Sequence, residues 1–188
     1  MKKYYLLYLL IISCSKLFAQ NVNQAVERDF INYSKLISDK KTDQALNYIN
    51  PKLFDLVPKE QMKVALEAVF NLPNIEYKIA VPTITKFSEV KTIDKISYVK
   101  LETISPVEMK FYDVALDSNK LNMMLKSFQN KFGTGNVKYD QKSGFFKINA
   151  IKQAVASSAD QSNWKFVTID NASMLTLLEK IIPAELLK

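Results

Sequence analysis

The stretch that decides the fold is FFKINAIKQAVASSADQSNWKFVTID, residues 145–170. Apolar and polar residues alternate along most of it, and a polar run interrupts the alternation near its middle. This pattern predicts two β-strands, Phe145–Ser157 and Asn163–Ile169, joined by a turn. The only tryptophan of the chain, Trp164, opens the second strand. The alternation is imperfect, so we expect both faces of this central hairpin to be partly covered.

In the segments before the hairpin, the spacing of apolar residues changes once, from a helical period to a strand period. Apolar residues first recur every three or four positions, which predicts helices at 22–38, 42–49 and 58–70. Pro58 suits the first position of the third of these helices. Alternation then predicts strands at 75–87, 96–104 and 107–114. We expect a polar turn at 91–95 and a strand break at Pro106, because proline cannot donate a backbone hydrogen bond.

Three further elements surround the hairpin. Asp117 caps a predicted helix at 117–132, with Gly133 at its end. A short strand at 137–139 pairs with the start of the hairpin, and a helix at 172–182, capped by Asn171 or Ser173, follows it. Helices followed by mostly antiparallel strands predict an α+β fold.

The first 19 residues resemble a secretory signal peptide. Lys2 and Lys3 form the basic start, an apolar run of about nine residues follows, and the segment ends in Leu17-Phe18-Ala19, with the small residue Ala19 before Gln20. The apolar run is shorter than the roughly 20 residues that a membrane-spanning helix needs. We therefore expect cleavage after Ala19, an exported protein in the periplasm or medium, and one domain over 20–188.

An alternative processing site lies inside this segment. Ile11-Ile12-Ser13-Cys14 resembles a bacterial lipobox, in which Cys14 would be lipidated and would anchor the protein to the outer membrane. Both interpretations place the domain outside the cytoplasm. A chain cleaved after Ala19 would contain no cysteine and hence no structural disulfide.

The composition argues against several classes of function. The sequence has no histidine and one cysteine, so Ser-His-Asp, Cys-His and His/Cys zinc chemistry are excluded. No glycine-rich phosphate loop or calcium-loop motif is present, and we expect no cofactor and no metal. The formal charge is +7, but Arg28 is the only arginine among 26 basic residues. Bidentate recognition of bases and phosphates relies on arginine, so we expect no nucleic-acid partner.

The order of elements resembles the NTF2-like (cystatin-like α+β) superfamily. The resemblance rests on Lys40-Lys41-Thr42-Asp43-Gln44-Ala45-Leu46 with Leu53-Phe54 after it, and on the closing Trp164-Lys165-Phe166-Val167. It implies N-terminal helices packed on a curved, mostly antiparallel sheet that forms a cone, whose mouth often holds a small apolar ligand. The helices at 117–132 and 172–182 would be additions to that fold.

Two Tyr-Asp pairs are the nearest candidates for the Asp/Tyr chemistry of enzymes in that superfamily. Tyr112-Asp113 ends the third predicted strand, and Tyr139-Asp140 lies in the small hairpin. Both aspartates stand just before predicted turns, where Asp commonly accepts backbone hydrogen bonds. The turn role is the favoured interpretation, and we assign no catalytic residue.

Three other residues are candidate ligand contacts. Lys152 lies between Ala150 and Ala154 on the same strand face, where it would meet an anionic ligand or extend its ammonium to the rim. Trp164 and Phe166 would stack on a ligand or belong to the core. With Tyr112 and Asp113 they complete the set of candidate binding residues.

These features support three hypotheses of function. The first is an exported, non-enzymatic domain that binds a small apolar ligand or an envelope protein. The second is an isomerase- or dehydratase-type enzyme that uses Asp and Tyr. The third is a ligand-free assembly domain that forms a homodimer through an outer sheet face. A cavity with a buried carboxylate would favour the enzyme, and a filled core would favour assembly.

Overall fold

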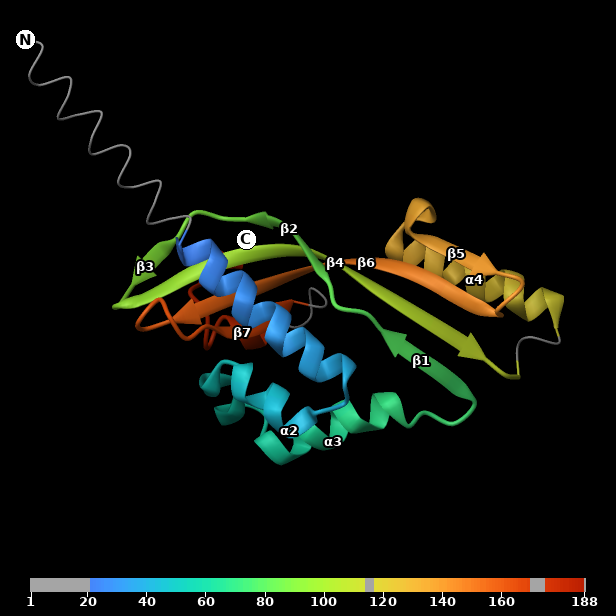
Figure 1. The fold of residues 1–188 in the computed structure, drawn as a ribbon, viewed down its shortest axis with the longest axis horizontal. Coiled ribbons are helices and arrows are strands. Elements are labelled where there is room, and N and C mark those ends of the chain that lie inside the picture. The colour runs from blue at the N-terminus through green and yellow to red at the C-terminus, as the bar shows by residue number, and fades with distance from the viewer. Residues whose placement is uncertain (1–20, 114–116, 170–174, 188) are drawn as a thin grey trace, which may run out of the picture.

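The computed structural model describes residues 21–113, 117–169 and 175–187. Within these ranges the protein is α+β, with helices packed on a seven-stranded antiparallel sheet that does not close. Figure 1 shows the long sheet, with the N-terminal helix lying across one half and α4 against the other end. The strands are β1 (Ile75–Ile79), β2 (Thr83–Phe87), β3 (Lys91–Ile93), β4 (Ile96–Phe111), β5 (Val137–Asp140), β6 (Phe145–Ser158) and β7 (Lys165–Ile169).

The helices vary widely in length. Residues 21–38 are the described part of the N-terminal helix. The others are α2 (Thr42–Ala45), α3 (Lys59–Phe70), α4 (Ser118–Phe132) and α5 (Leu175–Leu178), with 3₁₀ turns η1 (Leu46–Tyr48), η2 (Pro51–Asp55), η3 (Thr134–Asn136) and η5 (Ala184–Leu186). None of the helices in the described ranges combines the length and the apolar content that crossing a bilayer requires.

Strands β4 and β6 form the centre of the sheet. They pair antiparallel from Ser97–Ser158 to Met109–Phe146. Strands β1, β2 and β3 follow one another along the outer edge of β4, and β5 and β7 share the outer edge of β6. The predicted hairpin is therefore present as β6 and β7, and Trp164 stands directly before β7.

The two faces of the sheet carry different helices. Successive side chains of a strand point to opposite faces. The face that carries Ala154 and Ala156 packs against Val26 and Phe30 of the N-terminal helix, and we call it the helix face. Val155 points to the opposite face.

The opposite face is covered by the segment after the N-terminal helix and by the C-terminal end of the chain. Tyr98 and Val155 meet apolar side chains from both of these segments there. Leu46, Ile49, Leu53, Leu178, Ile181, Ile182 and Leu186 are the buried members. Asn50 donates its backbone N–H to the Phe166 carbonyl at 3.0 Å, which fixes the first of these segments along the edge of β7.

A third core lies at the far end of the sheet. Helix α4 packs Leu125, Phe128 and Phe132 against Val137 and Ile148. Its start is capped as predicted, because the Asp117 carboxylate accepts the backbone N–H groups of Asn119 and Lys120. None of the side chains of α4 is fully buried.

The predicted break at Pro106 is wrong. Strand β4 runs through this residue without interruption. Ala80 donates its N–H to the Pro106 carbonyl at 3.1 Å, so the backbone of Pro106 faces the junction between β1 and β2. The missing proline donor therefore falls opposite Ala80, where β1 has ended at Ile79 and β2 has not yet begun at Thr83. The same junction divides the single strand predicted at 75–87.

The predicted polar turn at 91–95 is also wrong in part. Lys91–Ile93 forms β3, which pairs with the start of β4. The turn contains only Asp94 and Lys95, both with positive φ (50° and 66°), as in tight two-residue hairpins. Three residues are too few for an alternating pattern to be recognised.

The C-terminal helix is shorter than predicted in the part that is described. Helix α5 ends at Leu178, and a turn leads to Pro183 and η5. The proposed caps Asn171 and Ser173 lie outside the described residues. The cone of the NTF2-like fold, and the placement of helices that it implies, remain predictions.

One buried carboxylate joins the N-terminal helix to the start of β7. Asp29 is 7% exposed, and its side chain accepts the Trp164 N–H at 2.9 Å. Removing the acceptor of a hydrogen bond to a charged group leaves a buried donor without a partner, at a cost of about 1.5–3 kcal/mol. We expect Asp29→Ala to lower the free energy of unfolding in urea by this amount. Asp29→Asn retains an acceptor and should lose less.

Glu27→Ala is the matched control, because it removes the same charge from an exposed position of the same helix. Its free energy of unfolding should stay within about 0.5 kcal/mol of the unmodified protein. Equal losses in Asp29→Ala and Glu27→Ala would contradict the proposed role of Asp29.

A second carboxylate organises the loop between β6 and β7. Asp160 accepts the backbone N–H groups of Asn163 and Ser162, both at 2.9 Å, and the Ser158 hydroxyl at 2.8 Å. These hydrogen bonds, led by that from Asn163, hold the pKa of Asp160 well below its ordinary range. The folded state therefore favours the ionised form of this group.

The resulting stability should depend on pH. A carboxylate with a depressed folded-state pKa contributes stability above its unfolded pKa of about 3.9, and loses it as the pH falls toward the folded-state value. We expect the difference in urea midpoint between the unmodified protein and Asp160→Asn to be constant from pH 7 to 5 and to shrink below about pH 4. Asp55→Asn, at an exposed carboxylate, is the control. A difference that stays constant down to pH 2.5 would rule out this role for Asp160.

Candidate functional site

A largely apolar cavity of about 330 Å³ opens on the helix face of the sheet. It lies between the N-terminal helix, α3, β1 and the middle of the central strands. The residues that line it include members of the N-terminal helix (Phe30, Tyr33, Ser34, Ile37), of α3 (Leu66, Val69), and of β1, β4, β6 and β7 (Tyr77, Ile79, Thr103, Ser105, Val107, Lys152, Ala154, Thr168). We call this space the helix-face cavity.

The sequence of β6 explains where the cavity forms. Phe146 and Ile148 lie under α4, whereas Ala154 and Ala156 lie under the N-terminal helix. Lys152 lies on β6 between the residues that contact these two helices. The residues paired with it on β4 have short polar side chains, Thr103 and Ser105. Small side chains between two helix-covered ends leave space that the core does not fill.

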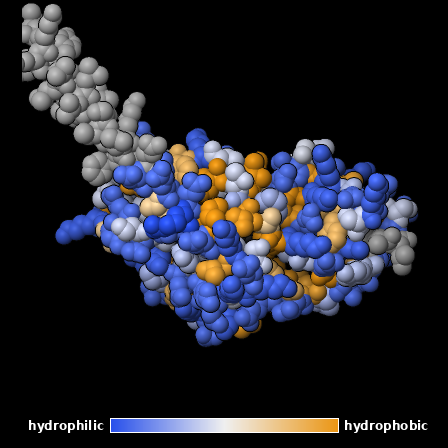
Figure 2. Space-filling model, in the orientation of Figure 1, coloured by the Kyte–Doolittle hydropathy of each residue, from blue (hydrophilic) through white to orange (hydrophobic). Residues whose placement is uncertain are grey.

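Helix α3 forms the outer wall of the cavity. Leu66 and Val69 line the space, and no side chain of α3 is fully buried. Val69 stays 39% exposed. Figure 2 shows hydrophobic side chains gathered in the middle of the molecule, between two more hydrophilic ends. The cavity therefore presents apolar surface that solvent reaches.

A hydrogen bond and aromatic contacts hold the N-terminal helix against β1 and β7 of the sheet. Ser38 donates its hydroxyl hydrogen to the Ile79 carbonyl of β1 at 2.7 Å. Phe166 packs between Phe30, edge to face at 5.2 Å, and Tyr33, stacked at 6.1 Å. These contacts fix the wall that carries Phe30 and Tyr33, so the cavity is built largely in advance of any ligand.

Lys152 and Tyr77 give the cavity its polar character. Lys152 is the one charged residue among the described residues that line it. Burial raises the pKa of the Tyr77 phenol above its ordinary value, and the positive charge of Lys152 partly offsets that rise. Tyr77 therefore keeps its proton near neutral pH and can donate a hydrogen bond.

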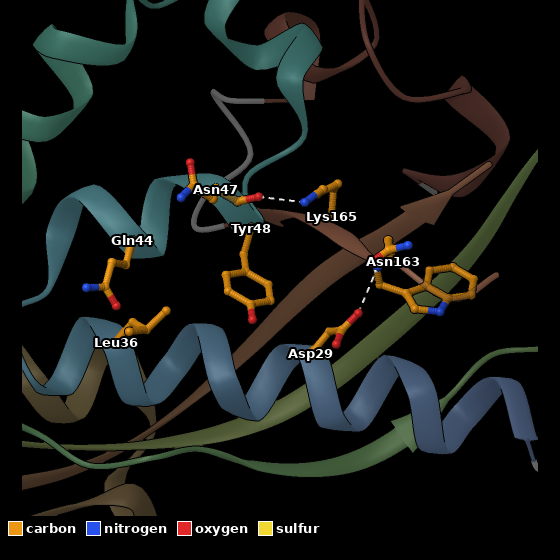
Figure 3. A pocket seen from close by; sticks show the side chains of 8 residues that line it. Asp29, Leu36, Gln44, Asn47, Tyr48, Asn163 and Lys165 are labelled. Atoms are coloured by element: carbon orange, nitrogen blue, oxygen red, sulfur yellow. Dashed lines mark hydrogen bonds between the residues drawn. The ribbon is translucent and has the colours of Figure 1, made fainter. Parts of the chain in front are cut away.

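A second cavity, of about 400 Å³, has mostly polar walls (Figure 3). It lies between the N-terminal helix, η1 and the start of β7. Lys165 donates to the Asn47 carbonyl at 2.7 Å, and Asp29 accepts the Trp164 N–H. Figure 3 shows the Tyr48 hydroxyl directed toward the N-terminal helix. Several polar groups here hold structural elements together, so the helix-face cavity is the stronger candidate site.

The predicted ligand contacts fall in different places. Lys152 lines the helix-face cavity. Trp164 and Phe166 are 0% exposed and belong to the core beneath the N-terminal helix. Trp164 also borders the polar cavity of Figure 3. Ligand binding by these two aromatic residues remains a prediction, and their observed contacts are those of core residues.

The two Tyr-Asp pairs lie at the α4 end of the sheet. Tyr112 is 51% exposed and donates to Glu76 at 2.9 Å, and Asp113 accepts a hydrogen bond from Asn74. The Asp140 carboxylate accepts the backbone N–H groups of the turn that follows it. An ion pair with Lys147 at 2.9 Å is the main cause that lowers the pKa of Asp140 to about 2.

Sequence reasoning missed Tyr77, Thr103 and Ser105. Tyr77 shares a strand face with Ile75 and Ile79, and this alternation was the available signal. The two β4 residues reach the cavity because Thr103 pairs with Lys152, a register that the sequence does not reveal. Within the described residues, no group of three acidic or thiol side chains lies close enough to hold a metal ion.

The geometry supports binding more directly than catalysis. The helix-face cavity can enclose an apolar group, and it offers a cation and hydroxyl groups on one side. The described residues that line it include no carboxylate, so they supply no Asp or Glu general base. Comparison with protein-family models, curated proteins and solved structures finds no match to this chain.

Proposed function

We propose that this protein is an exported, non-enzymatic domain that binds a small, largely apolar molecule in the helix-face cavity. The observation that carries the proposal is the cavity itself, about 330 Å³ of space with mainly apolar walls and a few polar groups on one side. Ligand sites in proteins typically measure about 300–1,000 Å³ and have this distribution of groups. An NTF2-like arrangement, with helices against the inner face of a curved sheet, belongs to the same proposal.

The Asp/Tyr enzyme is the weaker alternative. Asp113 and Asp140 lie at the α4 end of the sheet and hold turns or pair with neighbouring side chains. Tyr77 has the phenol that such chemistry uses, but the described cavity walls bring no carboxylate to it. A binding role needs only the shape and the polarity that are present.

A partner protein is a second candidate ligand, favoured by the exposed side of α3. Val64 of α3 is 63% exposed, Leu72, which follows this helix, is 42% exposed, and Val69, which lines the cavity, is 39% exposed. An apolar segment of an envelope protein could contact this surface and enter the cavity. Both versions of the proposal share one site, so blocking the cavity tests them together.

Filling the cavity should abolish binding without unfolding the protein. Ser105 lines the cavity and is half-buried, so Ser105→Phe would place a ring inside the space. The neutral apolar fluorophore N-phenyl-1-naphthylamine should bind the unmodified protein with enhanced emission. We expect the affinity to fall at least 10-fold in Ser105→Phe, because the added ring occupies the volume of the ligand.

Asn149→Phe is the matched control for this variant. It adds a ring at an exposed residue on the opposite face of β6. Its affinity for the fluorophore should match that of the unmodified protein. Equal affinity in all three proteins, or no binding by the unmodified protein, would contradict the proposed function.

The export part of the proposal has its own test. Expression of the full chain in a bacterial host should yield, in the periplasm or medium, a protein whose intact mass begins at Gln20. The physical reason is the short apolar segment followed by Leu17-Phe18-Ala19, which suits signal peptidase better than membrane insertion. A membrane-bound form with diacylglycerol on Cys14 would establish the lipoprotein alternative, and retention of Met1 would refute export.

A further inference from the structure

The charge inside the helix-face cavity indicates what kind of apolar molecule would fit it. Lys152 lies in the middle of β6, on the face that elsewhere carries the core residues Ile148 and Ala154. Its side chain is half-buried and lines the cavity. A cation in apolar surroundings is costly unless oppositely charged or hydrogen-bonding groups accompany it. A purely apolar ligand would remove water from this cation and supply neither.

The residues around Lys152 form a polar corner within the cavity. Thr103 lies directly opposite on β4, and its hydroxyl donates to the Lys152 carbonyl at 3.4 Å. Tyr77 lines the same cavity, and the positive charge of Lys152 partly offsets the rise in the pKa of its phenol. Two donor groups of different types, an ammonium and a phenol, therefore belong to the lining of one cavity.

The remainder of the wall suits an apolar chain. Ile37, Leu66 and Val69 line the cavity on the side of the N-terminal helix and α3. The space is thus amphipathic, with a cationic corner at the sheet and an apolar wall at the helices. A lysine ammonium has three N–H donors, so an anionic group can be added to the contacts that Lys152 makes within the protein.

We propose that the ligand is an anionic amphiphile, a monocarboxylate with an apolar tail, whose carboxylate binds Lys152 and Tyr77 and whose tail lies against Ile37, Leu66 and Val69. This inference rests on the proposed function, because it specifies the ligand of the same cavity. Charge-assisted hydrogen bonds are about twice as strong as neutral ones, so the head group should add substantially to the affinity.

Decanoate and decan-1-ol are a suitable pair of probes, because they share a ten-carbon chain and differ in head-group charge. Each is titrated at pH 7.4 against the protein loaded with N-phenyl-1-naphthylamine, below the concentration at which either aggregates. We expect decanoate to displace the fluorophore with an affinity at least 10-fold higher than that of decan-1-ol. This comparison uses the unmodified protein and does not depend on the folding of any variant.

Substitutions of Lys152 test whether this residue causes the preference for decanoate over decan-1-ol. Lys152→Met should lower the affinity for decanoate about 10- to 100-fold and leave that for decan-1-ol within about twofold. Lys152→Arg should retain most of the preference. Lys138→Met is the control, because it removes the same charge from an exposed residue of neighbouring β5. Urea unfolding of each variant verifies that the fold is intact.

The outcomes separate this inference from the proposed function. Equal binding of decanoate and decan-1-ol overturns the anionic ligand and leaves apolar binding in place. Equal losses in Lys152→Met and Lys138→Met also overturn it, since they would reflect overall charge. Failure of every probe, the fluorophore included, overturns both proposals together.

Discussion

The pairing of β4 with β6 is the constraint on which the rest of the structure depends. The two strands stay in register from Ser97–Ser158 to Met109–Phe146. The 14 residues of β6 extend about 46 Å at about 3.3 Å per residue, whereas the described helical residues 21–38 span about 27 Å at 1.5 Å per residue. These helical residues therefore cannot cover the ribbon alone. Separate helices cover its two ends, and the cavity occupies the interval between them.

The sequence predicted the elements well wherever a long periodic pattern existed. The hairpin of β6 and β7, the helix at 21–38 and α4 all have such patterns, because burial on one side imposes a period of 2 or 3.6. The effect of Pro106 does not follow from local sequence, because the consequence of a missing N–H donor depends on which backbone lies beside it. Its neighbour is the junction between β1 and β2, a tertiary relation that local sequence does not contain.

The candidate site was predictable only in part, for a related reason. Lys152 is recognisable in the sequence because a lysine between alanines on an apolar strand face is unusual. Tyr77 and Thr103 are not recognisable in this way, because their place in the same cavity depends on the pairing of β4 with β6 and on the contact between β1 and the N-terminal helix. The aromatic type of Trp164 and Phe166 does not distinguish a ligand contact from a core residue, because aromatic side chains bury much apolar surface and commonly belong to the core.

The shallow burial of α3 has a consequence for how fast a ligand would enter and leave the helix-face cavity. It forms one wall, yet none of its side chains is fully buried, and the residue that leads from it into β1, Asn74, has a φ of +60°. Elements with few buried contacts open locally at a small fraction of the free energy of global unfolding. The walls formed by the sheet and the N-terminal helix contain fully buried residues such as Val26 and Ala154. Entry and release of a bound molecule would therefore follow the local opening of α3, so residence time and affinity would be set by different parts of the protein.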